Sequence, residues 1–200
     1  MTGEGVTGAL LIFITTIALS LLGLFGAPQL IDRCLFRPYW YLRRREYDTV
    51  LASGFVHADL AHLIFNMVTF YFFAFPLERR IGTTWFVVLY SVGLVISELG
   101  TYRKHRNNPD YATLGASGAI SAVLFASIVY YPNNSLFIFP IPFPVPAPLF
   151  AIGYLAYTYW SARNPHGRIN HEAHLGGALT GLAFVAIKDP GAYQGLLGIF

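Results

Sequence analysis

The sequence predicts an all-α membrane protein, a bundle of six transmembrane helices with a long structured first loop. The first observation is composition, because 55% of the 200 residues are hydrophobic and only 12% are charged, against about 25% charged residues in a typical soluble domain. The second is a mean hydropathy of +0.52. The third is that the apolar residues gather in runs, with most of the lysines and arginines between them. A bilayer can accommodate this much apolar surface, whereas a water-soluble fold could not bury it.

The first expected span covers residues 6–25, since a helix needs roughly 20 apolar residues to cross a bilayer. No lysine or arginine precedes it and more apolar runs follow, so we expect a retained helix and not a cleaved signal peptide. A polar and aromatic stretch at residues 28–59 comes next and carries the run Arg43, Arg44 and Arg45. This stretch is the expected first loop.

Three more spans are expected in the central part of the chain. Residues 60–77 form the second span, which closes at a Glu-Arg-Arg triplet. Residues 85–99 form the third, and a basic loop follows at residues 103–109. The fourth covers residues 117–131 and ends before a proline.

Prolines occupy every second position in the latter part of the apolar stretch 137–148. Because proline lacks a backbone N–H and has a fixed φ, this pattern forbids a helix and favours an extended polyproline form. We expect a loop on the membrane surface there. The fifth span then covers residues 149–160 and the sixth covers residues 172–187. With no internal repeat and no linker, the chain is expected to be one domain over residues 1–200.

Ser117 lies between Gly115 and Gly118, where a loop is expected to become a helix. A helix N-terminus offers unpaired N–H groups and a partial positive charge. These groups suit the oxyanion that forms when a serine attacks a carbonyl, so Ser117 is a candidate nucleophile. The alternative is that this tetrapeptide serves packing alone, because small residues mark membrane helix interfaces.

His174 is the candidate general base. It lies three and seven residues before Gly177 and Gly181, so it shares a helix face with a stripe of glycines. A matching stripe of small residues begins at Gly118. If the two stripes pack, His174 can take the hydroxyl proton of Ser117 and return it to the leaving amine. The alternative is a histidine that only makes a structural hydrogen bond.

His62 and Asn66 lie one turn apart on the second expected span. An imidazole and an amide can both donate hydrogen bonds, so this pair suits the stabilisation of an oxyanion. The alternative is a hydrogen bond between helices.

Metal, cofactor and nucleic-acid sites are not expected. His171 and His174 are three residues apart, whereas the zinc-protease motif places its two histidines four apart. Cys34 is the only cysteine, and no second acidic cluster completes a ligand set. The basic residues are scattered rather than gathered on one face, so nucleic-acid binding is not indicated.

Four motifs occur in order along the chain. They are Phe-Val-His-Ala-Asp at 55–59 leading into His-Leu-Ile-Phe-Asn-Met at 62–67, Leu-Glu-Arg-Arg-Ile-Gly at 77–82, Gly-Ala-Ser-Gly at 115–118, and His-Leu-Gly-Gly-Ala-Leu-Thr-Gly at 174–181. In these motifs the chain resembles the rhomboid family of intramembrane serine proteases, of the bacterial six-span type. The resemblance covers residues 55–187.

The resemblance implies a dyad of Ser117 and His174 without a third acidic member. It also implies an oxyanion site made by the Ser117 backbone with His62 and Asn66, while Gly115, Gly118, Gly177 and Gly181 support helix packing. Glu78 and Arg80 match positions that anchor loop structure. The implied substrate is a single-span membrane protein, cut near its membrane boundary after a small residue. The implied location is a bacterial inner or cell membrane, with the protein crossing it several times.

The sequence departs from the family pattern at three places. A Trp-Arg pair is common in the first loop of the family, but residues 46–49 read Glu-Tyr-Asp-Thr. Some members place a tyrosine one turn after the nucleophile, where it packs on the base, but this chain has Ser121. His174 must therefore be held in another way. Phe73 and Ala74 replace a typical Leu-Gly pair.

The orientation in the membrane is predicted differently by charge and by resemblance. Loops one, three and five hold ten of the thirteen lysines and arginines, so the positive-inside rule places them and the start of the fourth span in the cytoplasm. Many bacterial rhomboids instead have an outward-facing site. We give the family more weight, because a structured first loop can carry arginines for its own reasons.

Two rival functions follow from the same residues. A rhomboid-like pseudoprotease would bind membrane helices without cutting them, but such proteins usually lack the serine or the histidine. A small transporter would line a polar path with His62, Glu98 and His174. It would be expected to show paired broken spans, which this sequence lacks.

Overall fold

The computed structural model describes residues 7–138, 142–164 and 169–198, and these form a bundle of helices. The first part holds α1 (Gly8–Leu21), the π-helical turn η1 (Leu22–Gly26), α2 (Pro28–Cys34), α3 (Pro38–Arg43), α4 (Thr49–Ala52) and the 3-10 turn η2 (Ser53–Phe55). The bundle continues with α5 (Leu60–Ile81), α6 (Thr83–His105), α7 (Ser117–Tyr130), α8 (Ala147–Arg163) and α9 (His171–Lys188), and η3 (Pro190–Ala192) and α10 (Tyr193–Leu197) follow. A two-stranded ribbon of β1 (Ser135–Leu136) and β2 (Val145–Pro146) precedes α8.

Three of the described helical segments are long and apolar enough to cross a membrane. They are Gly8–Gly26, which joins α1 to η1, together with α5 and α6. α7 has only 14 residues, or roughly 21 Å at 1.5 Å per residue, which is short of a hydrocarbon core of about 30 Å. α8 has 17 residues and α9 has 18. The order of the six expected helices is observed, and that all six cross the membrane stays a prediction.

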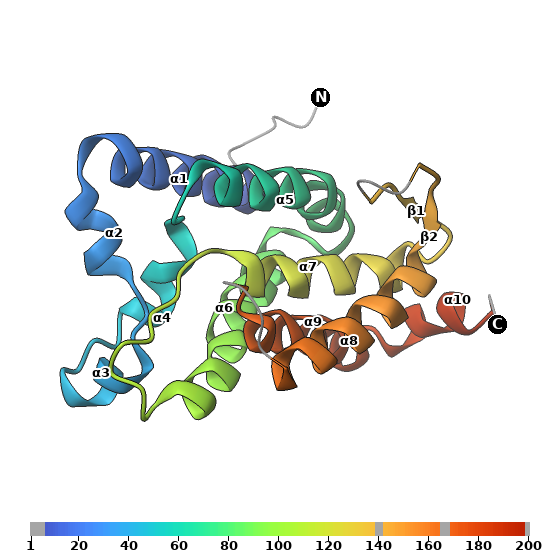
Figure 1. Cartoon of the computed structure of the whole chain (residues 1–200). Coiled ribbons are helices and arrows are strands. Elements are labelled where there is room, and N and C mark those ends of the chain that lie inside the picture. The colour runs from blue at the N-terminus through green and yellow to red at the C-terminus, as the bar shows by residue number, and fades with distance from the viewer. Residues whose placement is uncertain (1–6, 139–141, 165–168, 199–200) are drawn as a thin grey trace.

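α7 can be short because protein surrounds it. Every residue of α7 from Gly118 to Val129 is buried, and Figure 1 shows this helix between α5 on one side and α8 with α9 on the other. By contrast, large apolar side chains on the outer faces of α5 and α9 are exposed, such as Phe65 at 72% and Ile187 at 85%. An apolar exterior around a buried central helix is the arrangement that a bilayer requires.

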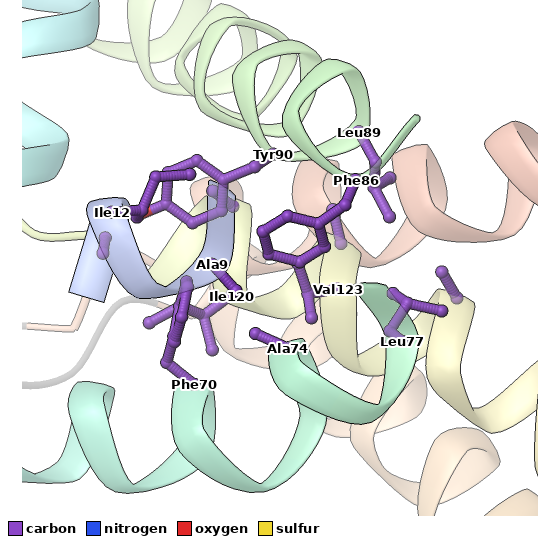
Figure 2. Close-up of a cluster of buried hydrophobic side chains, with 14 of the residues drawn as sticks. Ala9, Ile12, Phe70, Ala74, Leu77, Phe86, Leu89, Tyr90, Ile120 and Val123 are labelled. Atoms are coloured by element: carbon purple, nitrogen blue, oxygen red, sulfur yellow. The ribbon is translucent and has the colours of Figure 1, made fainter. Parts of the chain in front are cut away.

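The core where α1, α5, α6 and α7 meet is built from aromatic and small side chains (Figure 2). The ring of Phe70 on α5 lies edge-on to Phe86 and Tyr90 of α6, at centroid distances of 6.1 and 5.7 Å. Ala9 and Ala74 let the neighbouring helices approach these rings. Since lipid is as apolar as leucine, close packing of this kind holds membrane helices together.

Two helices extend beyond the predicted spans. α5 continues through Pro76 to Ile81 and ends at Gly82, whose φ of 83° suits a glycine. α6 continues to His105, so the predicted basic loop at residues 103–109 is wrong for its first three residues. The last turn of a helix carries partial negative charge and favours basic side chains, which explains why the helix continues past the apolar run.

The proline-rich stretch is extended only in part. Its described residues include β2, which pairs antiparallel with β1 just before the stretch, while Pro140 lies outside the described residues. The predicted loop is wrong at its end, because α8 already begins at Ala147 with Pro148 in its first turn. Proline is tolerated there, since the first N–H groups of a helix have no partner within the helix.

Candidate active site

α7 and α9 touch backbone to backbone just below the two predicted dyad residues. A Cβ atom added to Gly177 would lie 1.9 Å from the carbonyl oxygen of Gly118, and one added to Gly181 would lie 2.2 Å from that of Ala122. Ser117 is the first residue of α7 and directly precedes this contact. His174 lies one turn before Gly177 on α9, so both side chains start from the same level of the bundle.

α6 completes this junction. A Cβ atom on Gly118 would lie 2.2 Å from Ser97 Oγ, and one on Gly176 would lie 3.1 Å from the Cα atom of Ser97. The Ser97 hydroxyl donates to the carbonyl oxygen of Leu94 at 2.9 Å. Three helices therefore meet at Gly118, and none of them can shift without a collision or a gap.

His62 lies against the loop that leads into Ser117. The Asp59 side chain caps α5 by accepting from the His62 N–H at 2.7 Å, and Asn66 Nδ2 donates to the carbonyl oxygen of His62 at 2.9 Å. A Cβ atom on Gly115 would lie 2.5 Å from His62 Cε1. Gly115 also has a φ of 116°, so only glycine suits the position. Gly115 thus makes room for the His62 ring from a loop, and not from a helix face.

His57 is a residue of this site that sequence reasoning did not single out, although it stands in the first motif. The Ala116 N–H donates to His57 Nε2 at 3.4 Å, so the ring proton belongs on Nδ1, which lies 3.0 Å from Ser20 Oγ. The Ser20 hydroxyl can then donate to the carbonyl oxygen of Phe55 at 3.3 Å. Burial lowers the pKa of His57 to about 3, which keeps the ring neutral. His57 therefore ties α1 to the residue before Ser117.

The first loop is also bonded to the segment before α7. Phe36 and Thr113 exchange two backbone hydrogen bonds of 2.9 and 3.0 Å. The Gly115 N–H donates to the carbonyl oxygen of Ser53 at 2.9 Å. The backbone on the N-terminal side of Ser117 is thus fixed by elements that lie far from it in the sequence.

His174 is half-buried and is surrounded by rings. Tyr154 of α8 faces it with centroids 6.4 Å apart and planes 19° apart, and His171 lies edge-on at 6.1 Å. The His62 ring lies against Gly115, two residues before Ser117. The structure therefore brings histidines from α5 and α9 to the end of α7 that carries Ser117. Tyr154 was missed because sequence spacing cannot show which residue of one helix faces another.

Comparison with known proteins gives the family of this chain. A sequence model described as "Rhomboid domain" matches residues 44–189, which is most of the 200. The chain belongs to the rhomboid family. This confirms the family predicted from the four motifs, and it makes the chain an integral membrane protein.

Three rhomboid relatives illustrate the similarity, and all are mitochondrial by name. RHOMBOID-like protein 12, mitochondrial, of Arabidopsis thaliana is 28% identical over 156 residues, which cover 70% of this chain and 46% of that protein. Rhomboid protein 1, mitochondrial, of Saccharomyces cerevisiae is 29% identical over 170 residues, covering 80% and 48%. Presenilin-associated rhomboid-like protein, mitochondrial, of Homo sapiens is 33% identical over 149 residues, covering 68% and 36%. The chain spans less than half the length of each.

Two positions of the rhomboid motif at 77–82 have structural partners. Glu78 is buried, and its Oε1 accepts from the Ala9 N–H at 3.2 Å. The carboxylate thus anchors the first turn of α1, where helix N–H groups lack partners, and not a loop. The Arg80 guanidinium lies 5.4 Å from the ring centroid of Tyr130. Both contacts are structural and lie apart from the dyad residues.

The first turn of α9 is held by polar contacts on two sides. Asn170 caps the helix by accepting from the Ala173 N–H at 3.1 Å, and its amide donates to Thr101 Oγ1 at 2.9 Å. Lys104 pairs with Glu172 and also donates to the carbonyl oxygen of Ala162 at 2.7 Å. These contacts join α9 to α6 and α8 beside His174.

Among the described residues, no group of three histidine, cysteine, aspartate or glutamate side chains could hold a metal ion.

Proposed function

We propose that this chain is an intramembrane serine endopeptidase that uses Ser117 and His174 as its catalytic dyad. The contact of Gly177 with the backbone of Gly118 supports the proposal most directly, because it brings the beginnings of α7 and α9 to one level. His174 would act as a neutral imidazole that takes the Ser117 proton as Ser117 Oγ attacks the scissile carbonyl. The protonated His174 would then give that proton to the leaving amine, and water would hydrolyse the acyl-enzyme.

The oxyanion of the tetrahedral intermediate would form beside the N-terminus of α7. N–H groups in the first turn of a helix have no intrahelical acceptor, so the Ser117 backbone can donate to an oxyanion. His62 supports this assignment, because its ring lies against Gly115 in the adjoining loop. Asn66 donates to the carbonyl oxygen of His62 in this structure, so its contribution would use the second N–H of the amide.

The proposed substrate is a single-span membrane protein, cut near the membrane boundary after a small residue. The position of Ser117 supports this, since α7 begins next to the folded first loop at one end of the bundle (Figure 1). Water and an unwound substrate segment would reach the dyad from that end. The bacterial inner or cell membrane stays a prediction, and cell fractionation of the native source is its test.

The experiment that tests the dyad compares wild type with Ser117→Ala, His174→Ala and Ser127→Ala. Ser127 is a matched control, because it is a buried serine on the same helix far from the dyad. Ser117→Ala and His174→Ala should both lose cleavage of a single-span substrate and labelling by a serine-reactive fluorophosphonate. Their thermal unfolding midpoints should stay close to that of wild type, which shows that they still fold. The loss in kcat should be at least about 10³-fold, because a dyad acts as a unit.

Binding of the membrane helix without cleavage by wild type would replace the proposal with a pseudoprotease. Labelling that persists in Ser117→Ala would place the nucleophile elsewhere. Proton-coupled flux in liposomes that does not depend on Ser117 would favour the transporter.

A further inference from the structure

Tyr154 gives the proposed base an aromatic partner from a neighbouring helix. Its ring and that of His174 are nearly parallel, with planes 19° apart and centroids 6.4 Å apart, within the range in which aromatic pairs attract. Tyr154 belongs to α8, whereas Ser117 belongs to α7 and His174 to α9. Three different helices therefore supply the proposed nucleophile, the proposed base and the ring that is nearly parallel to the base.

Tyr154 is itself held by the helix that carries Ser117. Its hydroxyl lies 3.1 Å from Ser121 Oγ, within hydrogen-bond distance. Phe125, one turn further along α7, packs on it with centroids 5.4 Å apart, and Phe150 on α8 packs on it at 5.5 Å. Ser117, Ser121 and Phe125 follow at intervals of four residues and so share one face of α7. That face therefore carries both the nucleophile and the anchors of Tyr154.

We propose that Tyr154 is a positioning residue for His174 and that Ser121 holds it in place. This inference rests on the proposed function. A nearly parallel ring beside the imidazole limits the space into which His174 can rotate about its side-chain bonds, and the hydroxyl bond to Ser121 fixes the ring in turn. The small side chain of Ser121 leaves the space into which Tyr154 reaches from α8. The orientation of the base therefore depends on the position of α8.

A second contact between the same two helices provides the control. Tyr157 lies one turn from Tyr154 on α8, and its ring lies edge-on to His171 with centroids 5.4 Å apart. Both tyrosines join α8 to α9, but Tyr157 packs on His171 whereas Tyr154 pairs with the proposed base. A purely structural role for the tyrosines predicts similar losses at both positions, whereas positioning predicts a loss of turnover at Tyr154 alone.

The test compares Tyr154→Phe, Tyr154→Leu and Tyr157→Leu in the whole protein in detergent or liposomes. Tyr154→Phe keeps the ring and should retain kcat within about threefold, since ring stacking remains. Tyr154→Leu should lower kcat by about 10- to 100-fold, because a small misplacement of a catalytic group lowers the rate by an amount of that size. Its KM should stay within about twofold of wild type, because substrate contacts are unchanged. The rate of fluorophosphonate labelling of Ser117 should fall in parallel with kcat.

The inference is overturned if Tyr154→Leu retains kcat and the labelling rate, or if Tyr157→Leu loses as much of both. If Tyr154→Leu does not fold, Tyr154→Met fills a similar volume without a flat ring and carries the same comparison. Labelling of Ser117→Ala, measured in the same experiment, separates this inference from the proposed function. Labelling that is equal in wild type and Ser117→Ala overturns the proposed function, whereas labelling that needs Ser117 but ignores Tyr154 overturns only this inference.

Discussion

At the level of single residues, the hydrogen atom that replaces a side chain at Gly177 sets the distance between α7 and α9. Its Cα faces the Gly118 carbonyl oxygen so closely that a methyl group would lie 1.9 Å from that oxygen. Backbone cannot move aside as a flexible side chain can, so the helices would have to separate. Ser117 and His174 start from these two backbones and would separate with them.

Gly177→Ala is therefore predicted to lower both stability and turnover. We expect a loss of about 1–3 kcal/mol in the free energy of unfolding, in the range found for overpacked sites. Fluorophosphonate labelling of the folded fraction should fall as well, because the dyad distance grows. Gly153→Ala is the control, since no atom of the described residues lies within 4 Å of a Cβ atom there. That change should raise the free energy of unfolding by at most about 1 kcal/mol, because alanine is the better helix former.

Equal labelling rates for Gly177→Ala and wild type would show that the contact between Gly177 and Gly118 does not control the distance between Ser117 and His174. The measurements are denaturant unfolding in micelles and the labelling rate at a temperature where both variants are folded.

At the level of elements, Lys104 connects the last turn of α6 to the first turn of α9 and the last turn of α8. It pairs with Glu172 and donates to the carbonyl oxygen of Ala162. The Lys104 side chain is 33% exposed and that of Glu172 is 15% exposed, so water screens the pair only in part. Glu172 lies two residues before His174, and the contact therefore restrains the turn that carries the proposed base.

Lys104→Met should loosen this end of α9. Removing the charge leaves the Glu172 carboxylate and the Ala162 carbonyl without this donor. Because water partly screens the pair, we expect the free energy of unfolding to fall by only about 1 kcal/mol. Arg103→Met is the control, an exposed basic residue in the same helical turn. A double-mutant cycle with Glu172→Gln measures the coupling. If the two changes add with no coupling energy, the pair does not restrain α9.

The helices themselves could be predicted from the sequence, but their ends and partners could not. Apolar runs identified α5 and α6 because periods and lengths are local properties of the chain. The basic last turn of α6 was missed, since hydropathy changes at the membrane boundary whereas a helix does not have to end there. Ser117 and His174 were found because each stands in a short motif. Tyr154 depends on the rotation of α8, and the role of His57 depends on where the chain folds back, so neither was predicted.

At the level of the whole molecule, the folded first loop bears on the orientation in the membrane. Several of its arginines have partners within the protein, since Arg33 pairs with Asp48, Arg37 pairs with Asp32, and Arg43 and Arg44 lie over the rings of Tyr39 and Trp40. These arginines have a structural reason to be present. Their number is therefore a weaker sign of the cytoplasmic side than it would be in an unstructured loop.

We therefore predict that the first loop and the beginning of α7 face away from the cytoplasm when the chain is expressed in a bacterial membrane. Cys34, the only cysteine, ends α2 in this loop. Burial raises the pKa of its thiol, so labelling is best done at mildly alkaline pH, where more of the reactive thiolate is present. A membrane-impermeant maleimide should label Cys34 equally in intact and permeabilised cells. The control is Gly191→Cys in a Cys34→Ala background, which places an exposed thiol after α9 and should be labelled only after permeabilisation. The reverse pattern in the two proteins would show that the positive-inside rule holds and that the site opens to the cytoplasm.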